Sequence, residues 1–315
     1  MNLIVHIGPH KTGSTAIQRA LVDNRAELAR AGYYYPEIGF SEYGHHKLVE
    51  NLATNSAGEV LDNMLAELNT CPGTLVLSSE NFSLLSTNSI ALLARRINIE
   101  DVKIVYYLRS LPDNAWAWWQ ELVKHGDKRH FLLFYAELMT YPFRIHIINV
   151  NGILAKWADH FGRDAVNIFR YEEIEDTALH FFKNVLNLND VTTQAGFRIN
   201  KSFSMSDTEF MRVINVNGKS GLYILRNNKH AEELAREIAR QTSKYINQID
   251  VDYESIIFRL IESKLQSEWS DNIITKRPLD KVFLNRFSRL HFVDPIFWAE
   301  NPYFYSEVCR LASEY

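Results

Sequence analysis

A loop with the residue types of a phosphate-binding site lies near the start of this 315-residue chain. It reads Gly8-Pro9-His10-Lys11-Thr12-Gly13-Ser14-Thr15, between the apolar run Leu3 to Ile7 and a helix-like run that begins at Ala16. The backbone N–H groups of a glycine-containing turn, with those of the helix that it opens, form a cradle for anions. Lys11 adds charge, and Thr12, Ser14 and Thr15 add hydroxyl donors. We therefore expect this loop to bind phosphate.

The position of the lysine separates this loop from the common ATP and GTP loop. That loop reads G-x-x-x-x-G-K-[ST], with lysine directly after the second glycine and a hydroxyl that holds Mg²⁺. Gly8 and Gly13 keep the glycine spacing here, but Ser14 stands at the lysine position and Lys11 precedes the second glycine. This displacement disfavours the alternative of a Mg²⁺-dependent kinase or NTPase. A plain strand-to-helix turn with Ser or Thr capping is the alternative without a ligand.

Strand-like and helix-like segments alternate along the first two thirds of the chain. Short β-branched runs indicate buried strands, and apolar residues at helical spacing indicate helices. The expected strands are residues 3–7, 33–35, 74–78, 102–108 and 166–171, and the expected helices are residues 16–31, 61–68, 90–97 and 154–161. The alternation predicts an α/β fold with three layers, α/β/α, and a mostly parallel central sheet, as in P-loop NTPases. We expect one domain over residues 1–315, with 1–202 as the α/β core and 203–315 as a helical portion packed on it.

Polar residues follow three of the expected strands directly. The loop at Gly8 to Thr15, the pair Ser79-Glu80 and Arg109 each come where a strand ends. Ligands of parallel α/β sheets bind at the carboxyl ends of the strands. We therefore expect these three groups to converge on one site.

Two of these motifs resemble a known family. Lys-Thr-Gly-Ser-Thr after the first strand is similar to the 5′-phosphosulfate loop of sulfotransferases that use 3′-phosphoadenosine 5′-phosphosulfate (PAPS), in which the lysine precedes the glycine and transfer needs no Mg²⁺. The segment 102–109, a strand that ends in Leu108-Arg109, resembles the family's 3′-phosphate segment. The resemblance implies that Arg109 holds the 3′-phosphate, which suits its planar, permanently charged guanidinium.

Weaker resemblances follow in the same order as in bacterial members of the family. The segment 157–172 is similar to one of their helix-then-strand segments, and Arg198-Ile-Asn200-Lys201-Ser202 to another of their features. They imply that Lys201 and Ser202 help to hold the 3′ end of PAPS. One position departs from the family, which usually has a serine eight residues after the arginine, where this chain has Ala117. A non-catalytic nucleotide-binding protein therefore stays open as a further alternative.

Sulfuryl transfer to a hydroxyl or an amine requires a base for the acceptor proton and positive charge at the leaving phosphate. The resemblance assigns the charge to Lys11. It also implies that 3′-phosphoadenosine 5′-phosphate (PAP) is the product left from PAPS. For the base we favour Glu80, since the family often places an active-site group just beyond the third strand. His45, His46 and Glu37 are the competitors. A histidine titrates near neutrality, whereas a glutamate base needs a raised pKa.

Composition and charge limit the partners. The net charge is −4, so no overall basic field favours nucleic acid or acidic membranes. No apolar run approaches the ~18 residues of a membrane span, and no signal-peptide pattern opens the chain, so we expect a cytoplasmic protein without an integral membrane segment. Cys71 and Cys309 show no metal-ligand spacing, and no metal is expected. The resemblance implies a small-molecule or glycan acceptor, as in carbohydrate sulfation.

Overall fold

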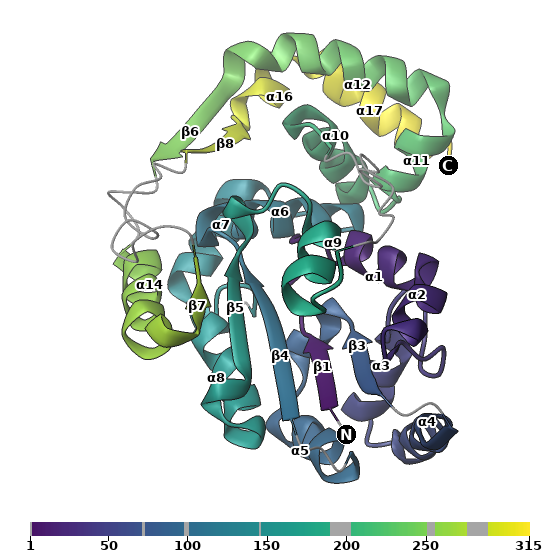
Figure 1. Cartoon of the computed structure of the whole chain (residues 1–315). Helices are drawn as coiled ribbons and strands as arrows, with labels where there is room; N and C mark the ends of the chain where they lie inside the picture. The colour runs from purple at the N-terminus through teal and green to yellow at the C-terminus, as the bar shows by residue number, and fades with distance from the viewer. Residues whose placement is uncertain are drawn as a thin grey trace. The chain divides into compact units, whose positions relative to one another are not determined.

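A computed structural model of the chain describes residues 2–70, 73–97, 101–144, 146–189, 203–250, 256–275 and 289–315 (Figure 1). These residues form two compact units. Unit 1 takes in the described residues within Met1–Ser110, Asn149–Ile199 and Leu260–Asn285. Unit 2 takes in those within Leu111–Ile148, Asn200–Arg259 and Arg286–Tyr315. The single domain over residues 1–315 stays a prediction.

A six-stranded sheet forms the centre of unit 1, in the order β2-β3-β1-β4-β5-β7. Every pair of neighbours in it is parallel. The strands are β1 (Asn2–His6), β2 (Tyr33–Tyr34), β3 (Thr74–Ser78), β4 (Asp101–Leu108), β5 (Val166–Arg170) and β7 (Ile273–Ile274). The chain crosses from β3 to β4 over β1, so the carboxyl end of β1 lies at a switch point of the topology, where ligands of such sheets bind.

Alternate residues of the strands face opposite sides of this sheet, and helices cover both. One side buries Ile4, Val76, Val105 and Phe169 in a core with apolar side chains of the first set of helices. That set is α1 (Ser14–Asp23), α2 (Arg25–Arg30), α9 (Thr177–His180), which Figure 1 shows in front of the sheet, and the π-helical turn η5 (Phe181–Val185). The opposite side faces α3 (His46–Ala53), α4 (Gly58–Thr70), α5 (Thr87–Arg96) and α8 (Val150–Phe161), which contact one another. The predicted three-layer α/β/α fold is therefore confirmed.

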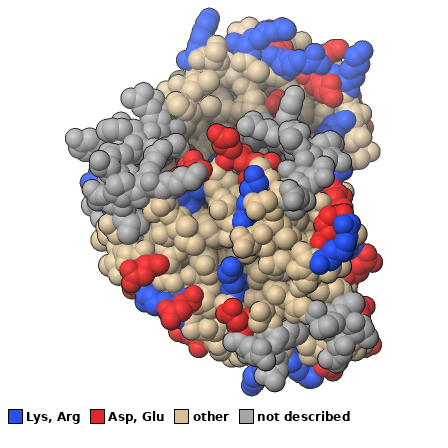
Figure 2. All heavy atoms as spheres, in the orientation of Figure 1, with Lys and Arg blue, Asp and Glu red and all other residues tan. Residues whose placement is uncertain are grey.

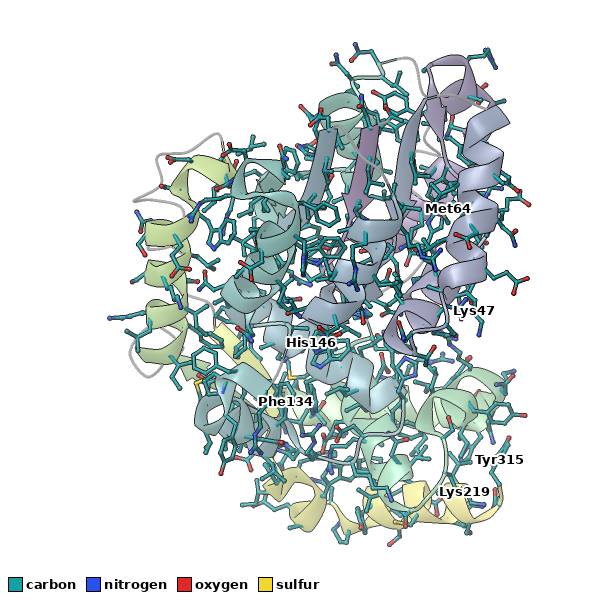
Figure 3. The ribbon with its side chains drawn as sticks, turned by 90° about the horizontal axis from the view of Figure 1, so that it is seen from below. Lys47, Met64, Phe134, His146, Lys219 and Tyr315 are labelled. Carbon is teal, nitrogen blue, oxygen red and sulfur yellow. The ribbon has the colours of Figure 1, made fainter. Side chains whose placement is uncertain are left out.

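Short helical turns and one further helix complete unit 1. They are η1 (Glu80–Leu84), η3 (Arg163–Ala165), η4 (Tyr171–Glu173), η7 (Ser270–Asn272) and α14 (Ile256–Trp269), whose first residues belong to unit 2. On α4, Met64 is buried at the side that faces the rest of the unit, whereas Lys47 of α3 lies exposed (Figure 3).

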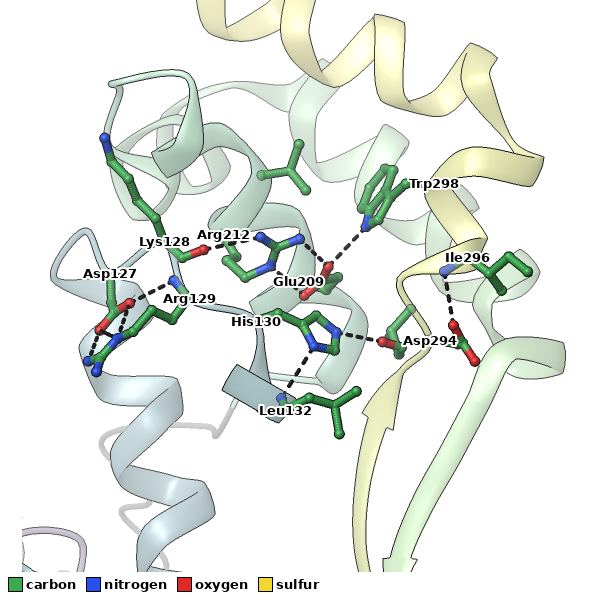
Figure 4. Close-up of polar contacts among 12 residues, drawn as sticks. Asp127, Lys128, Arg129, His130, Leu132, Glu209, Arg212, Asp294, Ile296 and Trp298 are labelled. Carbon is green, nitrogen blue, oxygen red and sulfur yellow. Dashed lines mark hydrogen bonds and ion pairs between the residues drawn. The ribbon is translucent and has the colours of Figure 1, made fainter. Parts of the chain in front are cut away.

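Unit 2 is mainly helical and has its own core. Its helices are α6 (Leu111–Lys124), α7 (Phe131–Thr140), η2 (Pro142–Arg144), α10 (Met205–Val216), α11 (Gly221–Asn227), α12 (Lys229–Thr242), η6 (Ser243–Tyr245), α16 (Ile296–Glu300) and α17 (Pro302–Ser313). The strands β6 (Ile246–Asp250) and β8 (Arg289–Val293) pair antiparallel. Inside the unit, the buried carboxylate of Glu209 accepts hydrogen bonds from Arg212 Nε at 2.8 Å and from Trp298 Nε1 at 2.9 Å (Figure 4). This network ties α10 to α16.

The strands after residue 203 were not expected from the sequence. β6 and β8 form their own small sheet, and β7 adds an edge strand to the central sheet through its pairing with β5. β7 has only two residues, so no periodicity marks it. Its position depends on pairing with a strand far earlier in the chain, where Ile273 lies opposite Ile168.

Charged side chains do not gather by sign on the face drawn in Figure 2, where basic and acidic groups lie in small mixed clusters. Within the described residues no helix combines the length and the apolar character that crossing a membrane requires.

Candidate functional site

The loop after β1 is a tightly closed turn at the carboxyl edge of the sheet. The hydroxyls of Thr12 and Ser14 both donate to the carbonyl oxygen of Pro9, at 2.7 and 3.3 Å. Lys11 and Gly13 have left-handed backbones, with φ of +68° and +80°. The hydrogens of these two hydroxyls are therefore used inside the loop, so the predicted anion site would draw on backbone N–H groups and the Thr15 hydroxyl.

Helix α1 begins at this loop without a side-chain cap. Its N-cap is Gly13, whose carbonyl accepts from the N–H groups of Ala16 and Ile17 at 3.0 and 3.2 Å. Within the described part of the chain, the N–H groups of Ser14 and Thr15 have no protein acceptor. Such orphan donors, at the positive end of the helix dipole, suit a phosphate oxygen.

Glycine is required at the two ends of the loop because other elements approach it closely. A Cβ at Gly8 would lie 2.9 Å from the Cα of Glu80, and a Cβ at Gly13 would lie 2.2 Å from Oγ1 of Thr177. The loop is thus clamped between the end of β3 and the start of α9. Thr177 had no signal in the sequence, because it lies far from the motif.

Arg109, at the end of β4, reaches the same loop. Its Nη1 donates to the carbonyl oxygen of Lys11 at 2.9 Å, and its guanidinium lies 5.5 Å from the ring centre of Tyr171. The next residue is held as well, since the backbone N–H of Ser110 donates to Glu172 Oε1 at 2.5 Å. The structure therefore joins Arg109 to the backbone of the Lys11 loop, and Tyr171 and Glu172 contact the end of β4.

Glu80 and His46 form the second half of the site. His46 Nε2 lies 4.0 Å from Glu80 Oε2, and His46 Nδ1 lies 2.7 Å from the hydroxyl oxygen of Ser79. The same Glu80 oxygen accepts a hydrogen bond from Gln18 Nε2 at 2.8 Å. If His46 Nδ1–H donates to Ser79, its Nε2 keeps a lone pair beside a carboxylate, which is the arrangement of a general base.

The environment of Glu80 keeps it ionised. Burial alone would raise the pKa of its carboxyl, but four other effects outweigh burial and leave the pKa below its ordinary value. These are a hydrogen bond with its own backbone N–H, the charges of His10 and His46, and the Gln18 amide. A carboxylate with a lowered pKa is a weak base, so the environment favours His46 over Glu80 as the proton acceptor.

The other two base candidates have different surroundings. His45 is fully buried among the rings of Tyr35 and Phe40 and accepts the Ser78 backbone N–H at 3.2 Å. Burial lowers the pKa of His45 to about 3. Glu37 is 78% exposed and pairs with Arg25 at the surface.

Three further predicted positions lie away from these contacts. Lys201 and Ser202 fall outside the described residues. Ala117 is buried on α6 in unit 2, so a small apolar side chain fits its surroundings. Among the residues that the structure describes, no group of three or more His, Cys, Asp and Glu side chains is arranged to hold a metal ion.

Comparison with known proteins adds little to this description. No family model matches the chain. No curated protein matches it either. A crystal structure of a sulfotransferase from Alicyclobacillus acidocaldarius is similar at 14% sequence identity and a TM-score of 0.39, over 74% of this chain and 95% of that one.

Proposed function

We propose that this protein is a sulfotransferase that transfers the sulfuryl group of PAPS to a hydroxyl or an amine of a glycan or a small metabolite. The observation that carries the proposal is the junction at Gly8, where the lysine-containing loop packs directly on Glu80 of the Glu80–His46 pair. An anion cradle and a base candidate thereby meet at one sheet edge. Sulfuryl transfer needs both.

The residues of the loop fit the phosphate groups of PAPS. The uncapped start of α1 offers the N–H groups of Ser14 and Thr15 to the 5′-phosphosulfate, and Lys11 adds charge. Arg109 is proposed to hold the 3′-phosphate, with Lys201 and Ser202 as further contacts. When bound, PAPS supplies the sulfuryl group, and its 5′-phosphate leaves with the electron pair of the broken S–O bond.

The protein's part in the reaction is charge stabilisation and proton transfer. Lys11 and the N–H groups of the loop stabilise the negative charge that develops on the leaving phosphate. His46 Nε2 takes the proton of the acceptor as the acceptor oxygen or nitrogen forms its bond to sulfur. Glu80 stabilises the imidazolium from 4.0 Å, and Ser79 orients the ring through Nδ1. This assigns the base to His46, with Glu80 as its charged partner.

Ligand binding and transfer test the proposal in sequence. We expect PAP to stabilise the protein against thermal unfolding without metal, whereas ATP with Mg²⁺ does not. A panel of glycan and small-molecule acceptors is then incubated with labelled PAPS. Lys11→Met should abolish transfer while the unfolding temperature without ligand stays unchanged. Stabilisation by ATP with Mg²⁺ alone would identify a kinase or NTPase, and PAP binding without transfer to any acceptor would favour a non-catalytic nucleotide-binding protein.

A further inference from the structure

Gln18 is a polar side chain buried at the junction between the loop helix and the end of β3. It lies in α1, five residues after Gly13, and only 2% of its surface is exposed. A buried amide has to find hydrogen-bonding partners, because leaving one unsatisfied costs free energy. The amide nitrogen of Gln18 donates to Glu80 Oε2 at 2.8 Å.

The segment before His46 has a glycine where the Gln18 amide packs against it. A Cβ at Gly44 would lie 2.9 Å from Cδ and 3.0 Å from Nε2 of Gln18. Gly44 does not have a left-handed backbone, so the requirement for glycine is one of space. Gln18 therefore contacts Glu80 and also the backbone two residues before His46.

Gln18 and His46 lie at different distances from the same oxygen of Glu80. The amide nitrogen is 2.8 Å from Oε2, within hydrogen-bonding range, whereas His46 Nε2 is 4.0 Å away, beyond it. The Gln18 donor thus directs the carboxylate and favours its ionised form. His46 faces the negative charge, yet its Nε2 is not committed to a hydrogen bond with it.

We infer that Gln18 is a positioning residue, whose amide holds the Glu80 carboxylate at its distance from His46 and so keeps Nε2 available to the acceptor. The catalytic role of Gln18 rests on the proposed function, in which His46 is the base. The placement of Glu80 by Gln18 is itself measurable without any substrate. A role in packing alone is the competing explanation.

The decisive variant is Gln18→Leu, which removes the donor and leaves a side chain of similar size. Carbon-13 NMR of the glutamate carboxyls, with Glu80 assigned by its absence in Glu80→Gln, should show the Glu80 pKa raised by about one unit in Gln18→Leu. Gln18→Glu, which is nearly identical in shape, should also raise the pKa of Glu80, because two adjacent carboxylates disfavour ionisation. It serves as the second variant if the leucine variant does not fold.

Gln120 provides a matched control in unit 2. It is also a buried helical glutamine, and its Nε2 donates at 3.0 Å to Phe203 O and to Thr208 Oγ1. Gln120→Leu should lower the unfolding temperature without changing the titration of Glu80. A merely structural role for Gln18 predicts the same behaviour for Gln18→Leu.

The activity assay separates this inference from the proposed function. In Gln18→Leu we expect transfer from labelled PAPS to fall by about 10- to 100-fold, with the affinity for PAP within about threefold of the parent. An unchanged Glu80 titration overturns the inference even if the parent transfers sulfate. A shifted titration in a protein that binds no PAP supports the positioning and overturns the proposed function instead.

Discussion

Arg109 and Lys11, which lie 98 positions apart in the sequence, are joined by one hydrogen bond, from the guanidinium Nη1 of Arg109 to the carbonyl oxygen of Lys11 at 2.9 Å. The bond uses the backbone carbonyl of Lys11 and not its side chain. It also makes the shape of the loop depend on the end of β4. Two residues that belong to different motifs are therefore joined at one edge of the sheet.

Replacing Arg109 should weaken binding at the 3′-phosphate more than at the 5′-phosphate. In Arg109→Lys we expect the affinity for PAP to fall by about 10- to 100-fold, because a lysine cannot hold a phosphate bidentately while it supports the loop. Adenosine 5′-phosphosulfate, which lacks the 3′-phosphate, should lose less affinity. Isothermal titration calorimetry of both ligands measures the difference, with Arg95→Lys, a change on the exposed side of α5, as control. Equal losses for the two ligands would mean that Arg109 only supports the loop.

Replacing His46 should stop the chemistry and leave cofactor binding intact. His46→Asn removes the proposed proton acceptor, and we expect transfer from PAPS to drop by about 100-fold or more. The PAP affinity should stay within about threefold of the parent. His125→Asn, at a histidine that is 73% exposed, is the matched control. If His46→Asn keeps full activity and Glu80→Gln loses it, the base is Glu80.

The steric effect of Thr177 on Gly13 can be separated from the free-energy cost of a left-handed backbone at that position. Gly13 and Gly32 share nearly the same φ, +80° and +81°, but a Cβ at Gly32 meets no atom within 4 Å, whereas one at Gly13 meets Thr177. Gly32→Ala should cost about 1 to 2 kcal/mol in unfolding free energy from backbone strain, and Gly13→Ala should cost about 1 to 3 kcal/mol more from overpacking. Urea denaturation of Gly13→Ala, Thr177→Ala and the double variant measures the coupling. The clamp predicts that Thr177→Ala recovers part of the loss, and strict additivity of the two changes would contradict it.

Two buried histidines should make the fold sensitive to mild acid. Burial lowers the pKa of His6 to about 4 and that of His45 to about 3, against an ordinary value of 6.5. Between pH 6.5 and 4 the unfolded chain takes up protons at both positions while the folded chain does not, so unfolding becomes easier as the pH falls. Each histidine should contribute a slope of about 1.4 kcal/mol per pH unit in this window.

Denaturation curves at pH 7, 6, 5 and 4.5 measure that slope. His6→Gln should reduce it by about one proton equivalent, and the exposed His125→Gln should leave it unchanged. Equal slopes in the parent and in His6→Gln would show that His6 is already protonated in the folded protein.

The carboxylate inside unit 2 should be a strong contributor to stability. Glu209 is 1% exposed and bonds to both Arg212 and Trp298. Glu209→Gln leaves the Arg212 side chain, which is 13% exposed, without its charged partner, and we expect a loss of about 2 to 4 kcal/mol in unfolding free energy. Glu237→Gln, which breaks the more exposed pair with Arg240, should cost less than about 1 kcal/mol. Similar losses for the two variants in denaturant titrations would contradict this account.

The sequence alone determined the class of the fold and the turn that follows the first strand. The apolar runs at residues 3–7, 74–78 and 102–108 predicted three central strands because buried parallel strands need continuous apolar segments. The spacing of Gly8 and Gly13 predicted the turn because it matches that of glycine-containing loops between a strand and a helix, and both glycines do have left-handed backbones. Both signals are local, and a local signal can be read from one stretch of chain.

Tertiary structure decided which polar residues act together. The four base candidates, of which the sequence favoured Glu80, have different surroundings once the chain is folded. Glu37 pairs with Arg25 at the surface, His45 is buried among aromatic rings, and His46 and Glu80 face each other. Gln18 and Thr177 belong to no motif, because their contacts are with residues far along the chain. Burial and neighbouring charge set the pKa of an ionisable group, and neither exists until distant segments pack together.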